Sequence, residues 1–418
     1  MRTLYTLSLL LTFLLAGCRS DQVTVSFMVF GGPEELAAYE SLVAAFHEAQ
    51  SEVRVELRYI PDQAEYRRRL AADFSAGAAP DVMLLNYRRF ATFAGQGGLQ
   101  PLGDYLAESA LLNEADFYPQ VIESFRYQGA LWCIPQNMSS LVVYYNQDLF
   151  DAAGLPYPAD DWTWDDFLLA AQRLTVDVDG DGRSDQYGAG IEPTLNRLAP
   201  FIWQAGGELV DDPQNPSRLA LTSPAALSGM QWFVELQTVH GVVPDALAQS
   251  AESNESRFLN GTLAMYFNSR RGVPTYRTIT HFTWDVAPLP RGLHEAGILH
   301  SDGYCLAASS QEKEAAWGFI EFANSTIGQE LIVETGRTVP SLRAVAESPA
   351  FLEPTKPPSR SYLFVQTIQT IRAVPVTANW PVVEDTASQD IEQAFFGRVS
   401  VQEAAETAVL RTTQFFGD

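Results

Sequence analysis

The chain has 418 residues, with 51 Asp and Glu against 27 Lys and Arg, which gives a formal net charge of −24. This length suffices for two domains with separate cores, and a hydrophobic content of 46% excludes a disordered acidic chain. Three cysteines are too few for a disulfide-rich scaffold. The excess of acidic residues argues against nucleic-acid binding, which depends on clustered Lys and Arg.

Residues 1–17 have the pattern of a secretory signal peptide. Arg2 precedes an apolar run at 7–15, and small residues follow at 16–17. The apolar run is shorter than the roughly 20 residues that a membrane span needs. Export is therefore expected, and a buried N-terminal helix is the alternative interpretation.

The end of this segment indicates a particular kind of signal peptide, that of a lipoprotein. Residues 15–18 (LAGC) resemble a bacterial lipobox, which implies cleavage before Cys18 and attachment of lipid to its sulfur. Residues 18–22 would then form the lipidated N-terminus and a short tether. Buried acyl chains would hold the protein at the extracytoplasmic face of the membrane, in the periplasm or at the cell surface.

Predicted strands and helices alternate after the tether. The β-branched and aromatic run at 23–30 predicts a buried strand, and apolar residues at spacings of three and four predict a helix over 34–50. Strands are expected at 53–60 and 81–85, with a helix at 63–75 between them. This order predicts an α/β lobe with a largely parallel sheet, in which ligands bind at the carboxyl ends of the strands.

A second lobe is expected beyond Pro135, with a Pro-rich break at 356–359 before a final, mostly helical stretch. No later stretch reaches the length of a membrane span. The periodicity of the remaining chain predicts helices at 164–174, 199–205, 224–240, 252–259 and 312–324, and strands at 263–267, 282–288 and 304–308.

Several short runs stand in order along the chain: APDV at 79–82, NYRRF at 86–90, GLQPL at 98–102, YYNQDLF at 144–150, AGLP at 153–156, WTWDDF at 162–167, FLNGTLAM at 258–265, AAWGFI at 315–320 and the segment 334–341. Together they resemble the family-1 extracellular solute-binding proteins of ABC importers, the group that contains maltose-binding protein. The resemblance covers roughly residues 23–410.

The resemblance implies a periplasmic-binding-protein-like α/β fold in which hinge strands join two lobes. Lobe 1 would comprise 22–135 and 306–350, and lobe 2 would comprise 136–305 and 351–418. It also implies a monomer that closes around a carbohydrate by hinge motion and delivers it to the transmembrane subunits of an ABC permease. A sugar phosphate, sugar acid or polyamine is the alternative ligand, and sensing instead of transport is the alternative role.

A saccharide presents apolar CH faces flanked by hydroxyls, so its site needs aromatic rings and convergent polar groups. Trp203 and Trp380 are the candidate aromatic platforms, and Trp380 stands where the family commonly has a pocket tryptophan. Core packing is the alternative for both. The polar candidates follow predicted strand ends or hinge segments, where turn chemistry is the alternative; they are Asn86, Tyr87, Arg88, Asn137, Asn268, Arg270 and Asp302.

Two departures from the family limit how far the ligand can be inferred. Leu85 stands where maltose-binding protein has a pocket tryptophan, and Arg88 stands where it has an aspartate, so its sugar specificity does not transfer. The basic pairs at 88–89 and 270–271 could hold a carboxylate or phosphate. Solvated surface arginines are the alternative interpretation.

Residues 177–185 (DVDGDGRSD) match the first nine positions of an EF-hand loop, which predicts a structural Ca²⁺ site. Gly182 supplies the sharp turn, but Gly188 stands where a Glu ligand is usual. A plain Asp-Gly turn is the alternative. The predicted oxygen ligands come from Asp177, Asp179, Asp181, the backbone carbonyl of Arg183 and Asp185.

Cys133 and Cys305 remain once Cys18 is assigned to the lipid. In an exported protein they form a disulfide or stay as buried free thiols, and the sequence leaves both open. The resemblance places them on adjacent hinge-crossing segments.

No enzymatic motif was found. The sequence has neither a Gly-x-Ser-x-Gly elbow nor a His-Glu-x-x-His helix, and its five histidines are scattered. A binding protein without catalytic residues is expected. A secreted glycoside hydrolase, which needs two carboxylates facing each other across a cleft, is the alternative.

Overall fold

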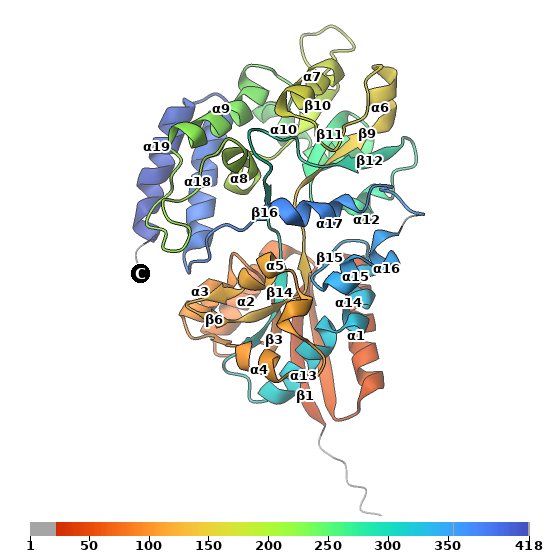
Figure 1. Ribbon diagram of the computed structural model, residues 1–418, viewed down its shortest axis with the longest axis vertical. Helices are drawn as coiled ribbons and strands as arrows, with labels where there is room; N and C mark the ends of the chain where they lie inside the picture. The colour runs from red at the N-terminus through yellow and green to blue at the C-terminus, as the bar shows by residue number, and fades with distance from the viewer. Residues whose placement is uncertain (1–21, 354, 417–418) are drawn as a thin grey trace, which may run out of the picture.

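The computed structural model describes residues 22–353 and 355–416, and Figure 1 shows that they form two lobes joined by crossing segments. This is the two-lobed α/β fold that the sequence predicted. The predicted signal peptide and Cys18 lie outside the described residues, so the structure does not test them. Among the described residues, no helix has the length and apolar character needed to span a membrane.

Lobe 1 is built on a mixed sheet of order β2-β1-β3-β14-β4, with β7 paired to β14. β1 runs parallel to β2 and β3, as predicted, whereas β14 is antiparallel to β3. The expected lobe boundary at 305/306 falls inside β14, so the first residues of this strand belong to the lobe 1 sheet. The strands are β1 (Val23–Phe30), β2 (Val53–Ile60), β3 (Val82–Asn86), β4 (Leu99–Gln100), β7 (Cys133–Pro135) and β14 (Asp302–Ala307).

Helices cover both faces of this sheet. α1, α13 and α14 pack together on one face, and α2 packs against β1 and β2. α1 buries Tyr39, Leu42 and Phe46 at helical spacing, and Asp62 caps α2 by accepting a hydrogen bond from the Glu65 N–H. The helices are α1 (Pro33–Ala49), α2 (Gln63–Ser75), α3 (Phe90–Gly95), α4 (Gly103–Glu108), α5 (Pro119–Glu123), α13 (Lys313–Asn324), α14 (Thr326–Val333), α15 (Arg343–Ala346) and α16 (Pro349–Leu352); β5 (Arg126–Tyr127) and β6 (Ala130–Leu131) form a small hairpin.

Lobe 2 has a sheet of order β10-β11-β9-β12, and α18 and α19 pack on α8 and α9 beside it. The C-terminal helices therefore return to lobe 2 (Figure 1). The strands are β9 (Val142–Asn146), β10 (Tyr187–Gly190), β11 (Leu263–Asn268) and β12 (Trp284–Ala287). The helices are α6 (Gln147–Ala152), α7 (Trp164–Leu174), α8 (Leu195–Gln204), α9 (Pro224–Thr238), α10 (Ala246–Ala251), α11 (Asn254–Asn260), α12 (Val273–Tyr276), α17 (Leu363–Gln366), α18 (Trp380–Phe395) and α19 (Val401–Thr412).

Two short strand pairs form the hinge between the lobes. β8 (Asn137–Met138) pairs with β15 (Val339–Pro340), and β13 (Gly297–Ile298) pairs with β16 (Ile371–Arg372). Ser139 and His300 add an isolated bridge between the same crossing segments. Because several separate segments cross here, the lobes can rotate relative to each other only about this narrow region.

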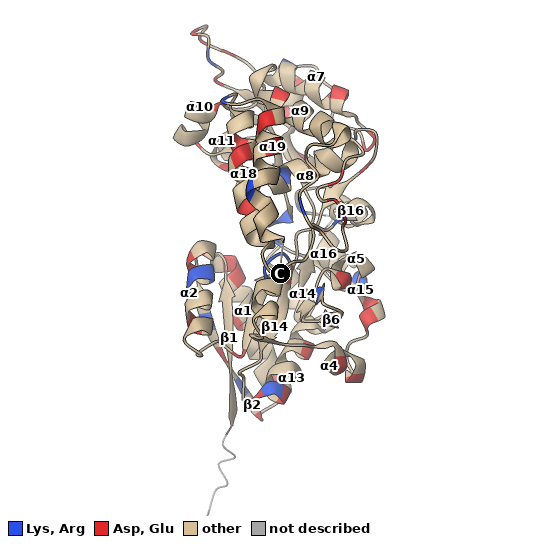
Figure 2. Ribbon diagram, turned by 90° about the vertical axis from the view of Figure 1, so that its left-hand side faces the viewer, with Lys and Arg blue, Asp and Glu red and all other residues tan. Residues whose placement is uncertain are grey.

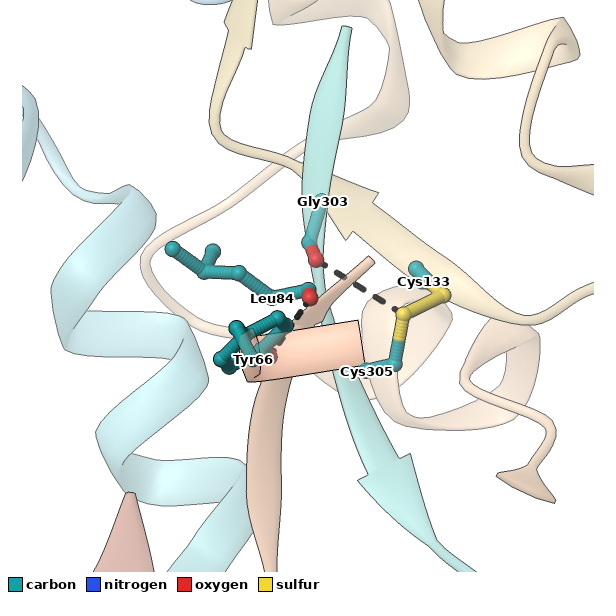
Figure 3. Close-up of a disulfide and its surroundings, with 5 residues drawn as sticks. All are labelled: Tyr66, Leu84, Cys133, Gly303 and Cys305. Atoms are coloured by element: carbon teal, nitrogen blue, oxygen red, sulfur yellow. Dashed lines mark hydrogen bonds between the residues drawn. A yellow bond between two sulfur atoms is a disulfide. The ribbon is translucent and has the colours of Figure 1, made fainter. Parts of the chain in front are cut away.

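A disulfide joins Cys133 to Cys305, which are directly opposite each other in the antiparallel β7–β14 pair (Figure 3). This settles the choice that the sequence left open. The two cysteines are fully buried and 172 residues apart in the sequence. Cys133 lies just before the chain enters the hinge, and Cys305 lies just after the chain returns from it to lobe 1. The disulfide therefore fixes the lobe 1 sides of two crossing segments to each other.

Candidate functional site

A cleft of about 360 Å³ lies between the lobes, at the carboxyl ends of β1 and β3. Lobe 2 contributes the start of α8 and the segment after β11, and the hinge contributes residues 136–139 and 300–301. Ligands of open α/β sheets bind at this edge, and the volume falls within the range of small-molecule sites. We call this cavity the interlobe cleft.

Five predicted ligand residues line the interlobe cleft: Asn86, Arg88, Asn137, Asn268 and Asp302. Asn86 and Asp302 are register partners in the β3–β14 pair, and Asn86 Nδ2 donates to Asp302 Oδ1 at 3.1 Å. The backbone N–H of Asp302 donates to Asn137 Oδ1 at 3.1 Å. Asn268, at the end of β11, donates from Nδ2 to the Tyr276 hydroxyl at 2.7 Å.

Two other predicted ligand residues are buried in the core and do not line the interlobe cleft. The Tyr87 hydroxyl accepts a hydrogen bond from the Val374 N–H at 3.3 Å, and burial raises the pKa of Tyr87 to about 12. Trp380 lies at the start of α18, fully buried and 6.4 Å from Phe416 between ring centroids. Both side chains are therefore part of the packed core.

Arg270 also lies outside the interlobe cleft. Its side chain is fully buried, and its Nε donates to the Gly336 carbonyl at 2.7 Å, so it belongs to the packing at the hinge. Burial lowers the pKa of Arg270 to about 10. The next residue, Arg271, lines the cleft instead.

Trp203 lines a different cavity, of about 810 Å³, with the β5–β6 hairpin and the segments 208–216 and 372–379. The Arg372 guanidinium lies 4.8 Å from the centre of the Trp203 ring, and Trp203 is only 3% exposed. A ring covered in this way offers little surface to a sugar. We call this second space the Trp203 cavity.

Further charged residues complete the interlobe cleft. They are Glu35, Arg67, Arg89, Glu192, Arg197, Arg271, His300 and Arg337. Arg89 and Arg271 belong to the basic pairs singled out in the sequence, and the others were missed. Arg337 pairs with Glu35 at 2.7 Å, and Arg197 pairs with Glu192 at 3.0 Å. The sequence signal that could have identified Glu35 is its position in the first helical turn after the strand at 23–30.

Glu35 is held by the turn between β1 and α1. Gly31 has a φ of 144°, and a Cβ there would lie 1.9 Å from Glu35 Oε2, so only glycine fits. The Gly32 N–H donates to the same oxygen at 2.5 Å. Burial raises the pKa of Glu35, while Arg337 and the Gly32 N–H act in the opposite direction.

The predicted calcium loop lies on the surface of lobe 2, between α7 and β10. Asp177, Asp179 and Asp185 have carboxylate oxygens within 4.8 Å of one another. Asp181 is outside this group, and its Oδ1 accepts a hydrogen bond from the Arg183 N–H at 2.8 Å. The structure thus brings together part of the predicted ligand set.

Residues 31–330 match the family described as bacterial extracellular solute-binding protein. The chain belongs to this family. A Listeria monocytogenes ABC substrate-binding protein in complex with cycloalternan has the same fold, with a TM-score of 0.86 and 23% identity over 94% of this chain and 99% of that chain. Maltose-bound MalE3 from T. maritima gives a TM-score of 0.78 at 22% identity, over 94% and 100%. The maltotriose-binding protein of Pyrococcus abyssi is 22% identical over 344 residues, which are 80% of this chain and 69% of that protein.

In this extracellular solute-binding protein, one ion pair joins the lobes beside the interlobe cleft. Arg88 NH1, just after β3, donates to both carboxylate oxygens of Glu384 in α18, at 2.7 and 2.8 Å. Asn196 Nδ2 donates to the same carboxylate at 2.6 Å. Burial acts to lower the pKa of Arg88, but the Glu384 carboxylate, Tyr87 and Asp302 together act against burial and the pKa is raised.

Replacing Arg88 or Glu384 with Gln is expected to destabilise the protein in a coupled way. Each single variant leaves a mostly buried partner without its counter-charge. The double variant should therefore lose less free energy of unfolding than the two single variants lose together. A coupling free energy of about 1–2 kcal/mol is expected from a double-mutant cycle measured by urea unfolding. Strictly additive losses would contradict a direct bridge between the lobes.

Asp302 is a half-buried carboxyl group that lines the interlobe cleft. Burial raises the pKa of Asp302, and the Asn86 hydrogen bond and the charges of Arg88, Arg271 and Arg337 act against the rise. When the pKa of a carboxyl is higher in the folded than in the unfolded protein, its ionised form lowers the free energy of unfolding. This cost is fully present at pH values above the folded-state pKa. The cost disappears as the pH falls through that value.

Asp302→Asn is therefore expected to raise the melting temperature of the ligand-free protein at neutral pH by roughly 1–2 °C. The amide keeps an oxygen that can accept the Asn86 hydrogen bond. The difference from the wild type should shrink in mildly acidic buffer, where the carboxyl is protonated in the folded protein. Asp104→Asn, at an exposed position, is the matched control. A variant less stable than the wild type at every pH would refute this account.

Proposed function

We propose that this protein is the substrate-binding component of an ABC importer and captures a saccharide in the interlobe cleft. The observation that carries the proposal is a cleft of ligand size whose polar lining comes from both lobes and the hinge. Closing the lobes would bury a ligand and give the protein a shape that a permease can recognise. The similar proteins named above bind or hold cycloalternan, maltose and maltotriose, and all three are saccharides.

The lining suits hydroxyl recognition. Asn137 and Asn268 offer both donor and acceptor atoms, and carboxylates such as Asp302 accept paired hydrogen bonds from neighbouring hydroxyls. These groups are already oriented by strand ends and by one another, so few side chains need ordering when a ligand binds.

A thermal-shift screen against mono- and oligosaccharides, sugar phosphates, sugar acids and polyamines tests this proposal. A ligand that binds only the folded protein raises its melting temperature. At least one saccharide should stabilise the wild type but not Asn137→Ala. Stabilisation by polyamines alone would overturn the proposal.

We infer that the cleft binds its ligand without changing it. Glu35 and Glu192, the carboxylates that could serve a hydrolase, are each paired with an arginine. A glycoside hydrolase needs two carboxyl groups that face each other across the bound sugar, and here both side chains are already engaged by arginines of the protein itself. Incubation with the stabilising saccharide, followed by product analysis, should return only the starting material, and released sugar would support the hydrolase alternative.

We also propose that the protein is a monomer attached through Cys18 to the outer face of the cytoplasmic membrane. The lipobox-like residues 15–18 support this. Mass spectrometry of the processed protein should find acyl chains on Cys18, and Cys18→Ser should shift the protein from the membrane to the soluble fraction. Light scattering of the released protein should give the mass of one chain. An unmodified Cys18 would refute the anchor.

We propose Ca²⁺ as a structural ion of the loop at 177–185. Three carboxylates within reach of one cation and the EF-hand-like spacing support it. Addition of Ca²⁺ to chelator-treated protein should raise the melting temperature, and Asp179→Asn should abolish the rise. An equal response of the variant and the wild type would argue against this site.

A further inference from the structure

The interlobe cleft carries positive charge in a protein that is strongly acidic. Figure 2 shows acidic residues spread over the outer helices of both lobes, such as α4 in lobe 1 and α18 in lobe 2. The cleft lining, by contrast, has twice as many arginines as acids. Its arginines are Arg67, Arg88, Arg89, Arg197, Arg271 and Arg337, and its acids are Glu35, Glu192 and Asp302.

Half of these arginines have no carboxylate partner. Arg88, Arg197 and Arg337 are paired with Glu384, Glu192 and Glu35, respectively. Among residues 22–353 and 355–416, the side chains of Arg67, Arg89 and Arg271 make no ion pair. The remaining acid, Asp302, is hydrogen-bonded by Asn86. Two positive charges therefore remain in excess.

The free guanidinium groups come from both sides of the cleft. Arg67 on α2 and Arg89 after β3 belong to lobe 1, and together they also line an extension of about 210 Å³ that opens beside Asn86 and Asp302. Arg271 belongs to lobe 2, in the short turn after β11. Its charge reaches across to lobe 1, where it acts on both Glu35 and Asp302.

The crowding of these cations is unfavourable without a ligand. Burial, followed by the charges of Arg89 and Arg88, lowers the pKa of Arg67. Like charges gathered in a partly desolvated cleft repel each other and attract anions from solution. An anionic group between them would remove this cost and would be contacted from both lobes at once.

The lining offers little to an uncharged sugar ring. Within the described chain, no tryptophan lines the cleft or its extension. The rings of Phe30, Tyr39 and Tyr66 are at most 9% exposed, and Phe93, in the extension, is the partly exposed ring. Neutral sugars rely strongly on such platforms. Arginine, with its planar fork of donors, is instead suited to carboxylates and phosphates.

We propose that the ligand is an anionic saccharide whose phosphate or carboxylate groups bind between Arg67 and Arg89 of lobe 1 and Arg271 of lobe 2. The inference rests on the proposed function, since it specifies the class of saccharide. The two excess charges match one phosphate monoester or two carboxylates. The anion then acts as the bridge that holds the lobes closed.

Titration calorimetry with matched sugars tests the inference. Glucose is compared with glucose 6-phosphate and glucuronic acid, and maltose with digalacturonic acid, at low and at high salt. At least one charged sugar should bind more tightly than its neutral counterpart, and added salt should weaken it. Arg89→Gln and Arg271→Gln should each reduce its affinity about tenfold to a hundredfold, because each removes charge-assisted hydrogen bonds.

Two exposed arginines without ion pairs serve as matched controls. Arg54→Gln in lobe 1 and Arg173→Gln in lobe 2 remove the same charge away from the cleft and should leave the affinity unchanged. If a neutral sugar binds as tightly as its charged counterpart and neither cleft variant weakens the binding, the ligand is not an anionic saccharide. The proposed function would then still stand. If no saccharide binds, or if inorganic phosphate alone binds as well as glucose 6-phosphate, the proposed function and this inference both fail.

Discussion

Replacing Arg270 with Ala is expected to lower the free energy of unfolding by about 3–5 kcal/mol. This residue follows the end of β11 in lobe 2 and is fully buried at the hinge. Its guanidinium lies over two aromatic rings and donates to three oxygens. The rings belong to Phe351 and Phe364, at 4.6 and 5.0 Å, and the acceptors are the Gly336 carbonyl, Ser361 Oγ and Glu353 Oε2.

Arg270→Met separates the two contributions to this loss. Methionine fills most of the space and keeps contact with the rings. The loss in free energy of unfolding should therefore fall to about 1–3 kcal/mol, which is the cost of leaving the buried Gly336 carbonyl without a hydrogen bond. Urea unfolding of both variants, with Arg54→Gln as the control, measures the difference. Equal stability of Arg270→Ala and the wild type would show that Arg270 does not contribute to the packing at the hinge.

Loss of the disulfide is expected to have a comparable effect. The Cys133→Ala, Cys305→Ala double variant should lose about 2–5 kcal/mol, because the bond closes a long loop that is otherwise free in the unfolded chain. The two residues are 172 positions apart in the sequence. Chemical unfolding of the oxidised wild type and of the double variant gives the difference directly.

A reducing agent provides the internal control for this prediction. It should bring the wild type close to the double variant and should leave the double variant unchanged. A loss below about 1 kcal/mol would contradict the role of the disulfide as a main constraint on lobe 1 and the hinge.

The regular elements were predicted well because their signals are local. The strand at 23–30 and the helix at 164–174 were predicted with the bounds that the structure has. Burial of one helical face or of a whole strand leaves a periodic pattern in the sequence itself. The antiparallel placement of β14 carries no such pattern, since it depends on a partner strand more than 200 residues earlier.

The site was predicted in part. Asn86 was found from a strand end and Asp302 from a hinge segment. Of the basic pair at 270–271, Arg270 was chosen as the ligand residue, whereas Arg271 lines the cleft. Adjacent residues in a tight turn point in different directions, and only the packing around the hinge decides which one is buried. The choice of Trp380 rested on the family's pattern, and here the ring fills the core under α18.

In the proposed function, a saccharide binds in the interlobe cleft and contacts both lobes. Hydrogen exchange measured by mass spectrometry, with and without the saccharide that raises the melting temperature, tests it most directly. Protection is predicted in peptides that cover 86–89 of lobe 1 and 268–272 of lobe 2 together, because closure shields both. Protection confined to the walls of the Trp203 cavity, at 203–216 and 372–379, would contradict the claim.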